Sequence, residues 1–114
     1  MRFLPTSTVA VVAVVLLSIT AVHADKTNKK SDKQIAEGRQ VFNRVCVACH
    51  GKEGAGTPMA RPLNQRGGTY GDTPQQIADV VRNGIRGTQM RAFKGDLKDE
   101  QIKALAAYIA SLRK

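Results

Sequence analysis

The chain has 114 residues and a formal net charge of +9, with 18 lysines and arginines against nine acidic residues. This length fits one domain. Such a small domain buries a modest core and usually needs further stabilisation, such as a disulfide bond, a metal ion or a bound cofactor. Aromatic residues make up only 4% of the chain and tryptophan is absent, which favours a core built around a cofactor. The chain has no patch of interleaved aromatic and basic residues, so we exclude nucleic acid as a partner.

The N-terminal residues are typical of an export signal. Arg2 provides a short basic start, and residues 9–22 are almost entirely apolar. Val22 and Ala24 are small residues at the two positions that a signal peptidase reads, so we expect residues 1–24 to be a signal peptide that is removed. The apolar stretch is shorter than the ~20 residues of a membrane span. We therefore expect no membrane insertion after cleavage, and an uncleaved N-terminal membrane anchor is the alternative.

The mature chain is predicted to begin with a flexible polar lead at residues 25–33, followed by one folded domain at residues 34–114. A first helix is expected from about residue 31 to residue 45, with Ser31 and Gln34 forming a capping box. Its buried face carries three apolar residues at helical spacing, Ile35, Phe42 and Val45. Gly38 lies on the same face, where a glycine costs about 1 kcal/mol relative to alanine, so we expect close packing there.

The sequence Cys46-Val47-Ala48-Cys49-His50 directly follows this helix. It is a C-x-x-C-H motif, which is the attachment signature of a c-type haem. Two cysteines at this spacing can each bond one vinyl group of a single haem, and the adjacent histidine then lies under the iron. A redox dithiol is the alternative, although it needs no histidine and no βαβ pattern surrounds the motif. A closed zinc site is less favoured, because it requires four ligands and the mature chain offers three.

The rest of the chain reads as two loops and two helices. Residues 51–71 are rich in glycine and predict a loop. A second helix is expected to begin at Thr73-Pro74-Gln75-Gln76, with threonine as the N-cap, and to end at Gly84. A second loop over residues 85–95 then leads to a last helix over residues 98–112. No segment alternates with a period of two, so we predict no sheet.

A haem iron has a second axial position, which no other mature histidine can fill. The mature chain holds two methionines, Met59 and Met90, and a methionine is an ordinary haem ligand as well as a core filler. Met90 lies forty residues after His50, which is enough chain to pass round the haem edge to its opposite face. We therefore weigh Met90 above Met59 as the second ligand.

From Ile35 to Leu112 the chain resembles the monohaem class I c-type cytochromes of the small soluble bacterial kind. The resemblance implies an all-α cytochrome c fold, with three main helices and loops wrapped around one covalent haem c. It implies covalent attachment at Cys46 and Cys49, and axial ligation of the iron by His50 and Met90.

The same resemblance assigns further positions. Pro62 and Leu63 match a Pro-Leu step, so the Pro62 carbonyl would accept a hydrogen bond from the His50 ring and Leu63 would touch the haem. Gly38 and Phe42 would cross the last helix near Tyr108. The family's distal-methionine segment matches Asn83-Gly84 with Met90 and Phe93, and its closing helix matches Ala106-Ala107-Tyr108-Ile109.

Two positions depart from the family pattern. Arg91 follows Met90 where the family often has proline, which removes a stiff φ angle and places a cation near the haem edge. Lys98 stands where the last helix commonly begins with serine or threonine, so we expect Asp96 or Asp99 to cap that helix instead.

The resemblance implies a periplasmic electron carrier rather than an enzyme. One alternative is a haem subunit of a dehydrogenase or oxidase complex. Another is a haem enzyme or sensor with an open distal site, which would require Met90 not to bind.

Removal of Arg2 with the signal lowers the net charge to +8, and two haem propionates would lower it to about +6. We expect a monomer that meets redox partner proteins through their acidic docking faces. The electrostatic field of a basic protein attracts an acidic surface and so raises the rate of encounter. The cations proposed to frame the haem are Lys52, Arg61, Arg86, Arg91 and Lys94.

Overall fold

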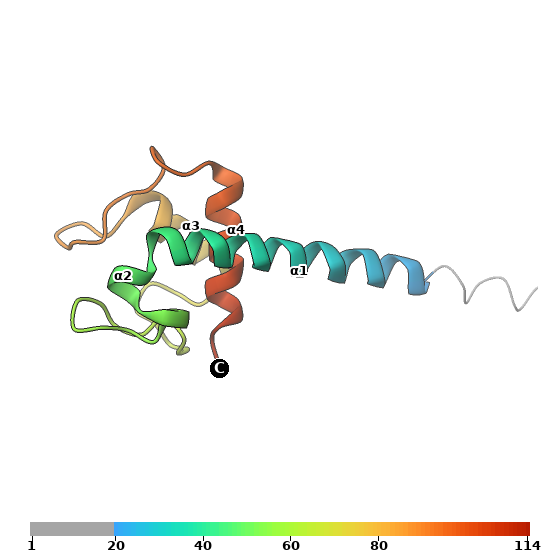
Figure 1. Cartoon of the computed structure of the whole chain (residues 1–114), viewed down its shortest axis with the longest axis horizontal. Helices are drawn as coiled ribbons and strands as arrows, with labels where there is room; N and C mark the ends of the chain where they lie inside the picture. Colours follow the sequence, from blue (N-terminus) through green and yellow to red (C-terminus); the bar gives the residue numbers. More distant parts are fainter. Residues whose placement is uncertain (1–19) are drawn as a thin grey trace, which may run out of the picture. The chain divides into compact units, whose positions relative to one another are not determined.

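The computed structural model describes residues 20–114, and residues 1–19 of the predicted signal peptide lie outside this range (Figure 1). Its helices are α1 (Thr20–Val45), α2 (Val47–His50), the 3₁₀ turn η1 (Lys52–Gly54), α3 (Pro74–Asn83) and α4 (Asp99–Ser111). The described residues contain no strand and only one isolated bridge, between Thr57 and Ala60. The prediction of an all-α fold is therefore confirmed. Residues 31–114 form one compact unit.

Helix α1 begins well before the predicted start. Ser31 lies inside the helix rather than at its N-cap, so the proposed capping box with Gln34 is wrong. The physical reason is that no glycine or proline lies between Thr20 and Gly38, and helix formation propagates easily once a turn has formed. Residues 25–33 are accordingly helical, with exposed side chains.

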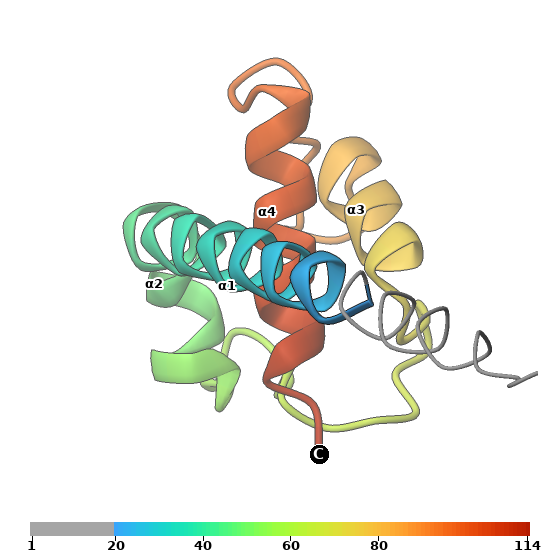
Figure 2. The ribbon, with the colours of Figure 1, turned by 90° about the vertical axis from the view of Figure 1, so that its right-hand side faces the viewer.

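Helix α1 crosses α4 at Gly38, where the two backbones meet (Figures 1 and 2). A Cβ atom at Gly38 would overlap the backbone carbonyl of Ala104 and would lie 2.8 Å from the Cβ of Tyr108. One turn later, the rings of Phe42 and Tyr108 pack edge to face, with centroids 5.4 Å apart and planes at 62°. The predicted close packing at Gly38 is therefore confirmed, and it brings the end of α1 onto the centre of α4.

Helix α3 has the termini that its sequence predicts. Thr73 is the N-cap, and its hydroxyl accepts a hydrogen bond from the Gln76 N–H at 3.2 Å. The Gln76 side chain accepts one from the Thr73 N–H at 3.1 Å, which completes the capping box. Gly84 follows the last turn with a φ of +69°. The helix packs against α4 (Figure 2).

The start of α4 differs from the prediction. Lys98 is the N-cap residue, and neither Asp96 nor Asp99 caps the helix. The Gln101 side chain instead accepts a hydrogen bond from the Lys98 N–H at 2.9 Å. Asp99 is the first residue of the helix, and it pairs with Arg82 at 2.6 Å and with Lys103 at 2.7 Å. A carboxylate in the first helical turn still stabilises the positive end of the helix dipole.

The core of the compact unit is apolar, and no polar residue among those described is fully buried. Phe42, Ile102 and Leu105 are its largest fully buried side chains, and α3 adds Ile77 and Val81. Within residues 20–114 no helix combines the length and apolarity that crossing a membrane requires.

Candidate haem site

The C-x-x-C-H motif folds into a single helical turn at the end of α1. The Cys46 N–H donates to the Phe42 carbonyl at 2.8 Å, so the motif continues directly from the helix. The Cys46 carbonyl accepts from the N–H groups of Cys49 at 3.3 Å and His50 at 3.0 Å. Residues three positions apart in such a turn lie on the same side, so the two thiols project from one surface. Cys46 is half-buried, Cys49 is exposed, and both are free thiols.

The environment of Cys46 disfavours the dithiol interpretation. Burial, and secondarily the proximity of Cys49, raises the pKa of the Cys46 thiol to about 11. A redox dithiol relies on a cysteine whose pKa is lowered, because the thiolate is the reactive form. In the described part of the chain, no three His, Cys, Asp or Glu side chains gather in the way that a metal ion requires.

The His50 ring is available as a neutral ligand. Burial lowers the pKa of its imidazole below 6.5, so the ring stays neutral and keeps a lone pair at neutral pH. Its Nδ1 atom is buried and has no hydrogen-bond partner among the described residues. The expected hydrogen bond to the Pro62 carbonyl is therefore not formed in this structure. A buried polar atom without a partner is costly, and a ring that binds a metal through one nitrogen normally donates through the other.

The loop after the motif is tied back to it by two hydrogen bonds, and a third bond closes the loop on itself. The Gly56 N–H donates to the His50 carbonyl at 2.8 Å, and the Thr57 hydroxyl donates to the Cys49 carbonyl at 2.5 Å. The Leu63 N–H donates to the Gly54 carbonyl at 2.7 Å. These bonds place the predicted Pro62-Leu63 step close to the motif in space, although twelve residues separate them in sequence.

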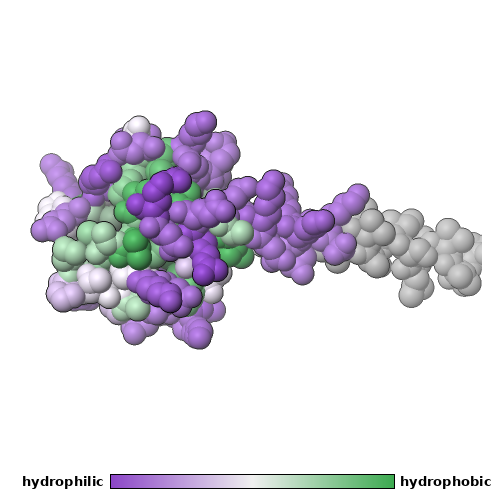
Figure 3. Space-filling view, in the orientation of Figure 1, coloured by the Kyte–Doolittle hydropathy of each residue, from purple (hydrophilic) through white to green (hydrophobic). Residues whose placement is uncertain are grey.

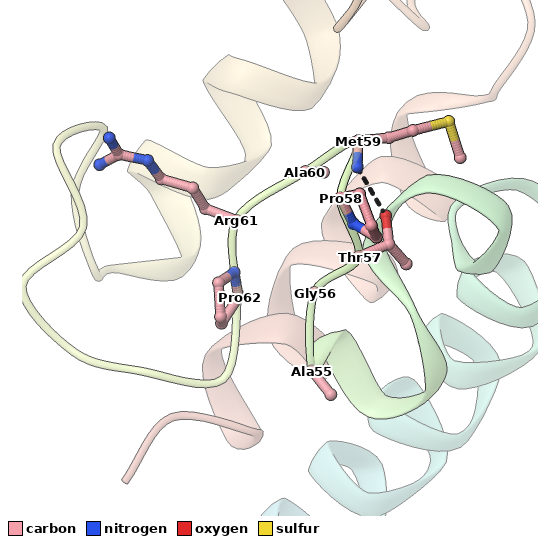
Figure 4. A pocket seen from close by; sticks show the side chains of 8 residues that line it. All are labelled: Ala55, Gly56, Thr57, Pro58, Met59, Ala60, Arg61 and Pro62. Carbon is pink, nitrogen blue, oxygen red and sulfur yellow. Dashed lines mark hydrogen bonds between the residues drawn. The ribbon is translucent and has the colours of Figure 1, made fainter.

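A hollow of 480 Å³ opens beside this loop and is lined by residues 55–62 (Figure 4). The side chains of Met59 and Arg61 point away from the loop in different directions. Met59 is 64% exposed, so it takes no part in the core.

Met90 has a different setting in the loop between α3 and α4. Its carbonyl accepts from the Ile85 N–H at 2.8 Å, and its N–H donates to the Thr88 hydroxyl at 3.1 Å. The loop returns against Gly84, where a Cβ atom would lie 2.7 Å from the Met90 carbonyl oxygen. The Met90 side chain is half-buried against the hydrophobic core. This position supports the choice of Met90 over Met59.

The surface around the motif fits a flat apolar cofactor. Cys46, Leu63 and Met90 come from three separate segments, and all three are only partly covered while they pack on the same core. Apolar side chains are visible at the surface of the compact unit, among polar ones (Figure 3). An apolar plate requires side chains of this kind, which rest on a core and are not themselves fully covered. The neutral ring of His50 adds a metal-binding group.

The expected ring of cations needs one correction. Lys52, Arg61, Arg86 and Lys94 are exposed and form no ion pair with the described residues. Arg91 instead pairs with Asp96, and its guanidinium lies 4.3 Å from the centre of the Phe93 ring. Arg91 is therefore an exposed cation that is paired with a carboxylate, whereas the other four have no such partner among the described residues.

Comparison with known proteins identifies the family. A family model described as "Cytochrome C oxidase, cbb3-type, subunit III" matches residues 33–109. The chain belongs to this family of c-type cytochromes. Cytochrome c6 of Leptolyngbya boryana is 41% identical over 76 residues, covering 65% of this chain and 87% of its own. Cytochrome c6 of Thermosynechococcus vestitus is 31% identical, covering 95% of this chain and 88% of its own.

The cytochrome is of the monohaem class I type, with a covalently bound haem c as its cofactor. It is 37% identical to the cbb3-type oxidase subunit FixP of Bradyrhizobium sp. strain ORS 278 over 79 residues. That match covers 68% of this chain and 27% of FixP, so the cytochrome spans less than a third of the oxidase subunits it resembles. The solved cytochrome cL of Methylophaga aminisulfidivorans shares the fold, with a TM-score of 0.62, 24% identity, and coverage of 70% of this chain and 53% of its own.

Sequence reasoning missed the residues that hold the site together. Thr57 and Thr88 each accept a hydrogen bond from the N–H of the methionine two positions later, at 3.1 Å. The repeated Thr-x-Met spacing was a readable signal for these turns, because threonine hydroxyls commonly bond backbone groups two residues on. Arg113 is the other missed residue. Its hydrogen-bond partners lie more than forty residues away in the sequence, so no local sequence pattern could predict them.

Proposed function

We propose that the protein is a periplasmic electron carrier with one His/Met-ligated haem c. In this proposal Cys46 and Cys49 each add across one haem vinyl group, so that sulfur bonds to one vinyl carbon and the thiol hydrogen goes to the other. His50 and Met90 would be the protein ligands of the iron, and Pro62 and Leu63 would border the haem. When bound, the haem supplies a one-electron couple between ferrous and ferric iron.

The observation that carries the proposal is the pairing of a helical C-x-x-C-H turn with a half-buried methionine forty residues later. Neutral His50 and the thioether of Met90 are the two ligand types that cytochromes c use. With both axial positions filled, oxygen and peroxide have no open iron site to bind. A thioether ligand also favours the reduced iron, which raises the potential.

The chain's own residues contribute orientation and burial. The hydrogen bonds from Gly56 and Thr57 hold the motif and the loop after it as one unit. The close approach at Gly84 fixes the backbone of the Met90 loop against the end of α3. Ligands that are held in place rearrange little when the iron changes its oxidation state. Holding them is what the protein contributes to electron transfer.

The partner is proposed to be a redox protein with an acidic docking face, which the cytochrome meets as a monomer. The net charge and the exposed cations Lys52, Arg61, Arg86 and Lys94 support this. A second candidate is a haem subunit within an oxidase complex. The matches to oxidase subunits FixP and CcoP support it, while the matches to cytochrome c6 over most of that protein's length favour the single carrier.

A redox titration followed by mixing experiments tests the function. The exported protein should be reduced and reoxidised reversibly by one electron per chain. The reduced form should be stable in air for much longer than it takes to pass its electron to an added terminal oxidase of the cbb3 type. Rapid binding of carbon monoxide, or turnover of peroxide by the cytochrome alone, would instead establish an open distal site. Copurification with an oxidase at fixed stoichiometry would favour the subunit reading.

A further inference from the structure

Arg113 is a charged side chain that is almost covered, with 9% of its surface exposed. It follows α4, and its side chain reaches the segment that begins at Leu63. Its Nε donates to the Leu63 carbonyl at 3.2 Å, and its Nη1 donates to the Gly71 carbonyl at 2.6 Å. The same Nη1 pairs with the carboxylate of Asp72. One guanidinium thus joins both ends of the segment 63–72, which we call the tethered loop.

The tethered loop has few other restraints. Within the loop, the Gly71 N–H donates to the Gly68 carbonyl at 3.0 Å and the Gly67 N–H to the Asp72 carboxylate at 2.9 Å. At its ends, the Asn64 N–H donates to the Gly54 carbonyl at 3.3 Å and the Asp72 N–H to the Gln76 side chain at 3.1 Å. The side chains of residues 65–70 are exposed, and a Cβ at Gly67 would meet nothing within 4 Å. A loop with so little packing depends for its order on the groups that hold its ends.

Leu63 is held through both of its backbone polar groups. Its N–H donates to the Gly54 carbonyl at 2.7 Å and its carbonyl accepts from Arg113. The Leu63 N–H and the Pro62 carbonyl belong to one planar peptide unit, so fixing the first fixes the direction of the second. Gly54 lies close enough that a Cβ there would be 3.1 Å from the Leu63 Cβ. The Pro62-Leu63 step therefore has one anchor near the motif and one at Arg113.

We propose that Arg113 is a positioning residue for the haem site, which acts by holding Leu63 and the tethered loop in place. The inference rests on the proposed function, in which Pro62 and Leu63 border the haem. Arginine suits this role because its planar fork can serve several oxygens at once, whereas lysine carries a point charge. Arg113 acts through Leu63 and its loop.

The test compares Arg113→Gln and Arg113→Lys with wild type as holoproteins. Amide hydrogen exchange reports the tethered loop, and the reduction potential and the NMR signal of the His50 ring N–H report the haem site. In Arg113→Gln, exchange at Gly67 and Gly71 should accelerate by roughly tenfold or more. The potential and the ring N–H signal should both move. Arg113→Lys should behave like the glutamine variant, because the requirement is geometric rather than for charge alone.

Arg82→Gln is the matched control. Arg82 is also an ion-paired arginine, bound to the carboxylates of Asp79 and Asp99, but it links α3 to α4 and bonds neither the tethered loop nor the motif. Its removal should lower stability while the potential and the loop exchange stay at the wild-type values. An Arg113→Gln protein with wild-type exchange and potential would overturn the proposal. So would full restoration by Arg113→Lys, or an equal shift of potential in Arg82→Gln.

The outcomes also separate this proposal from the proposed function. A wild-type protein whose His50 does not bind iron would remove both. A His/Met-ligated wild type whose signals are unmoved by Arg113→Gln would remove only the role of Arg113.

Discussion

Met59 and Met90 share a local turn and differ in their packing. Each donates its N–H to a threonine hydroxyl two positions earlier, at the same distance of 3.1 Å. Met90 rests on the core, whereas Met59 is 64% exposed. The tertiary setting, rather than the residue type or its turn, therefore separates a candidate ligand from a surface side chain.

Replacing Met90 with alanine should open the distal side of the iron. The reduction potential should fall, because the thioether that favours reduced iron is lost. Affinity for added imidazole should rise by about tenfold or more, which corresponds to removing a competing ligand worth at least ~1.4 kcal/mol. Potentiometry and imidazole titration measure both effects. Met59→Ala is the control and should change neither, and the reverse pattern would move the ligand to Met59.

At the scale of elements, the crossing of α1 and α4 fixes where the haem motif begins. Gly38 lets the two backbones touch, and the edge-to-face pair of Phe42 and Tyr108 follows one turn later. Cys46 comes one further turn along, since its N–H bonds the Phe42 carbonyl. The orientation of the motif is thus inherited from the helix crossing.

Gly38→Ala should destabilise the protein by about 1–3 kcal/mol, as overpacked cores do. The gain of roughly 1 kcal/mol in helix propensity is smaller, because the added methyl group would overlap the backbone of Ala104. Denaturant unfolding of the holoprotein measures the change. Gly95→Ala is a suitable control, because a Cβ there meets nothing within 4 Å. Equal stability of the two variants would contradict the close crossing.

The start of α4 carries a second testable contact, the carboxylate of Asp99 between Lys103 and Arg82. Hydrogen bonds from Lys103 and then Arg82 lower the pKa of Asp99 below its ordinary value of 3.8. A lowered folded-state pKa means that the stabilisation is complete above the unfolded value and is lost as pH falls through the folded value. Unfolding measured between pH 5 and about pH 2 should show this loss. Asp99→Asn should flatten the profile, and an unchanged profile would argue against the contact.

The sequence predicted elements best where the signal is local. Helix α3 begins at the capping box of Thr73 and Gln76 and ends at Gly84, as predicted. Each of these signals lies within a few residues of the helix end that it marks. The prediction of where α1 begins was wrong. Ser31 and Gln34 have the spacing of a capping box, but no glycine or proline lies between Thr20 and Ser31, so the helix extends back to Thr20. The prediction that Asp96 or Asp99 caps α4 was also wrong. The Asp99 carboxylate accepts a hydrogen bond from Arg82, which lies seventeen residues earlier in the sequence. Arg113 and Arg91 likewise depend on partners that only the folded chain brings together.

At the scale of the molecule, the candidate site draws on segments that are far apart in sequence and that pack, partly covered, on one hydrophobic core. The motif, the Pro62-Leu63 step and the Met90 loop were each identified from the sequence with the help of the family resemblance. Only the structure shows that Gly54 holds Leu63, that Thr57 holds the motif, and that Gly84 lies against the Met90 loop. The basic charge is likewise visible in the composition, but the structure removes Arg91 from the free cations.

Electron transfer to the physiological partner should slow as salt rises. The Debye length falls from ~10 Å at 0.1 M to ~3 Å at 1 M, so attraction between exposed charges fades over that range. Lys94→Glu should lower the association rate and leave the potential almost unchanged, because rim charges act mainly on encounter. Bimolecular rates against ionic strength provide the measurement. Lys33→Glu, on α1 outside both loops, makes the same change in net charge and should have the smaller effect. A rate that is flat or rises with salt would leave the charge as a solubility feature.

The central claim is that one haem is bonded to Cys46 and Cys49, and the intact mass of the denatured, solvent-extracted protein tests it most directly. Thioether bonds survive unfolding and extraction, whereas axial ligation alone does not. The exported chain should have the mass of residues 25–114 plus one haem, with none released into the solvent, and the double variant Cys46→Ala/Cys49→Ala should carry no covalent haem. A wild-type chain with the mass of the polypeptide alone would contradict the account.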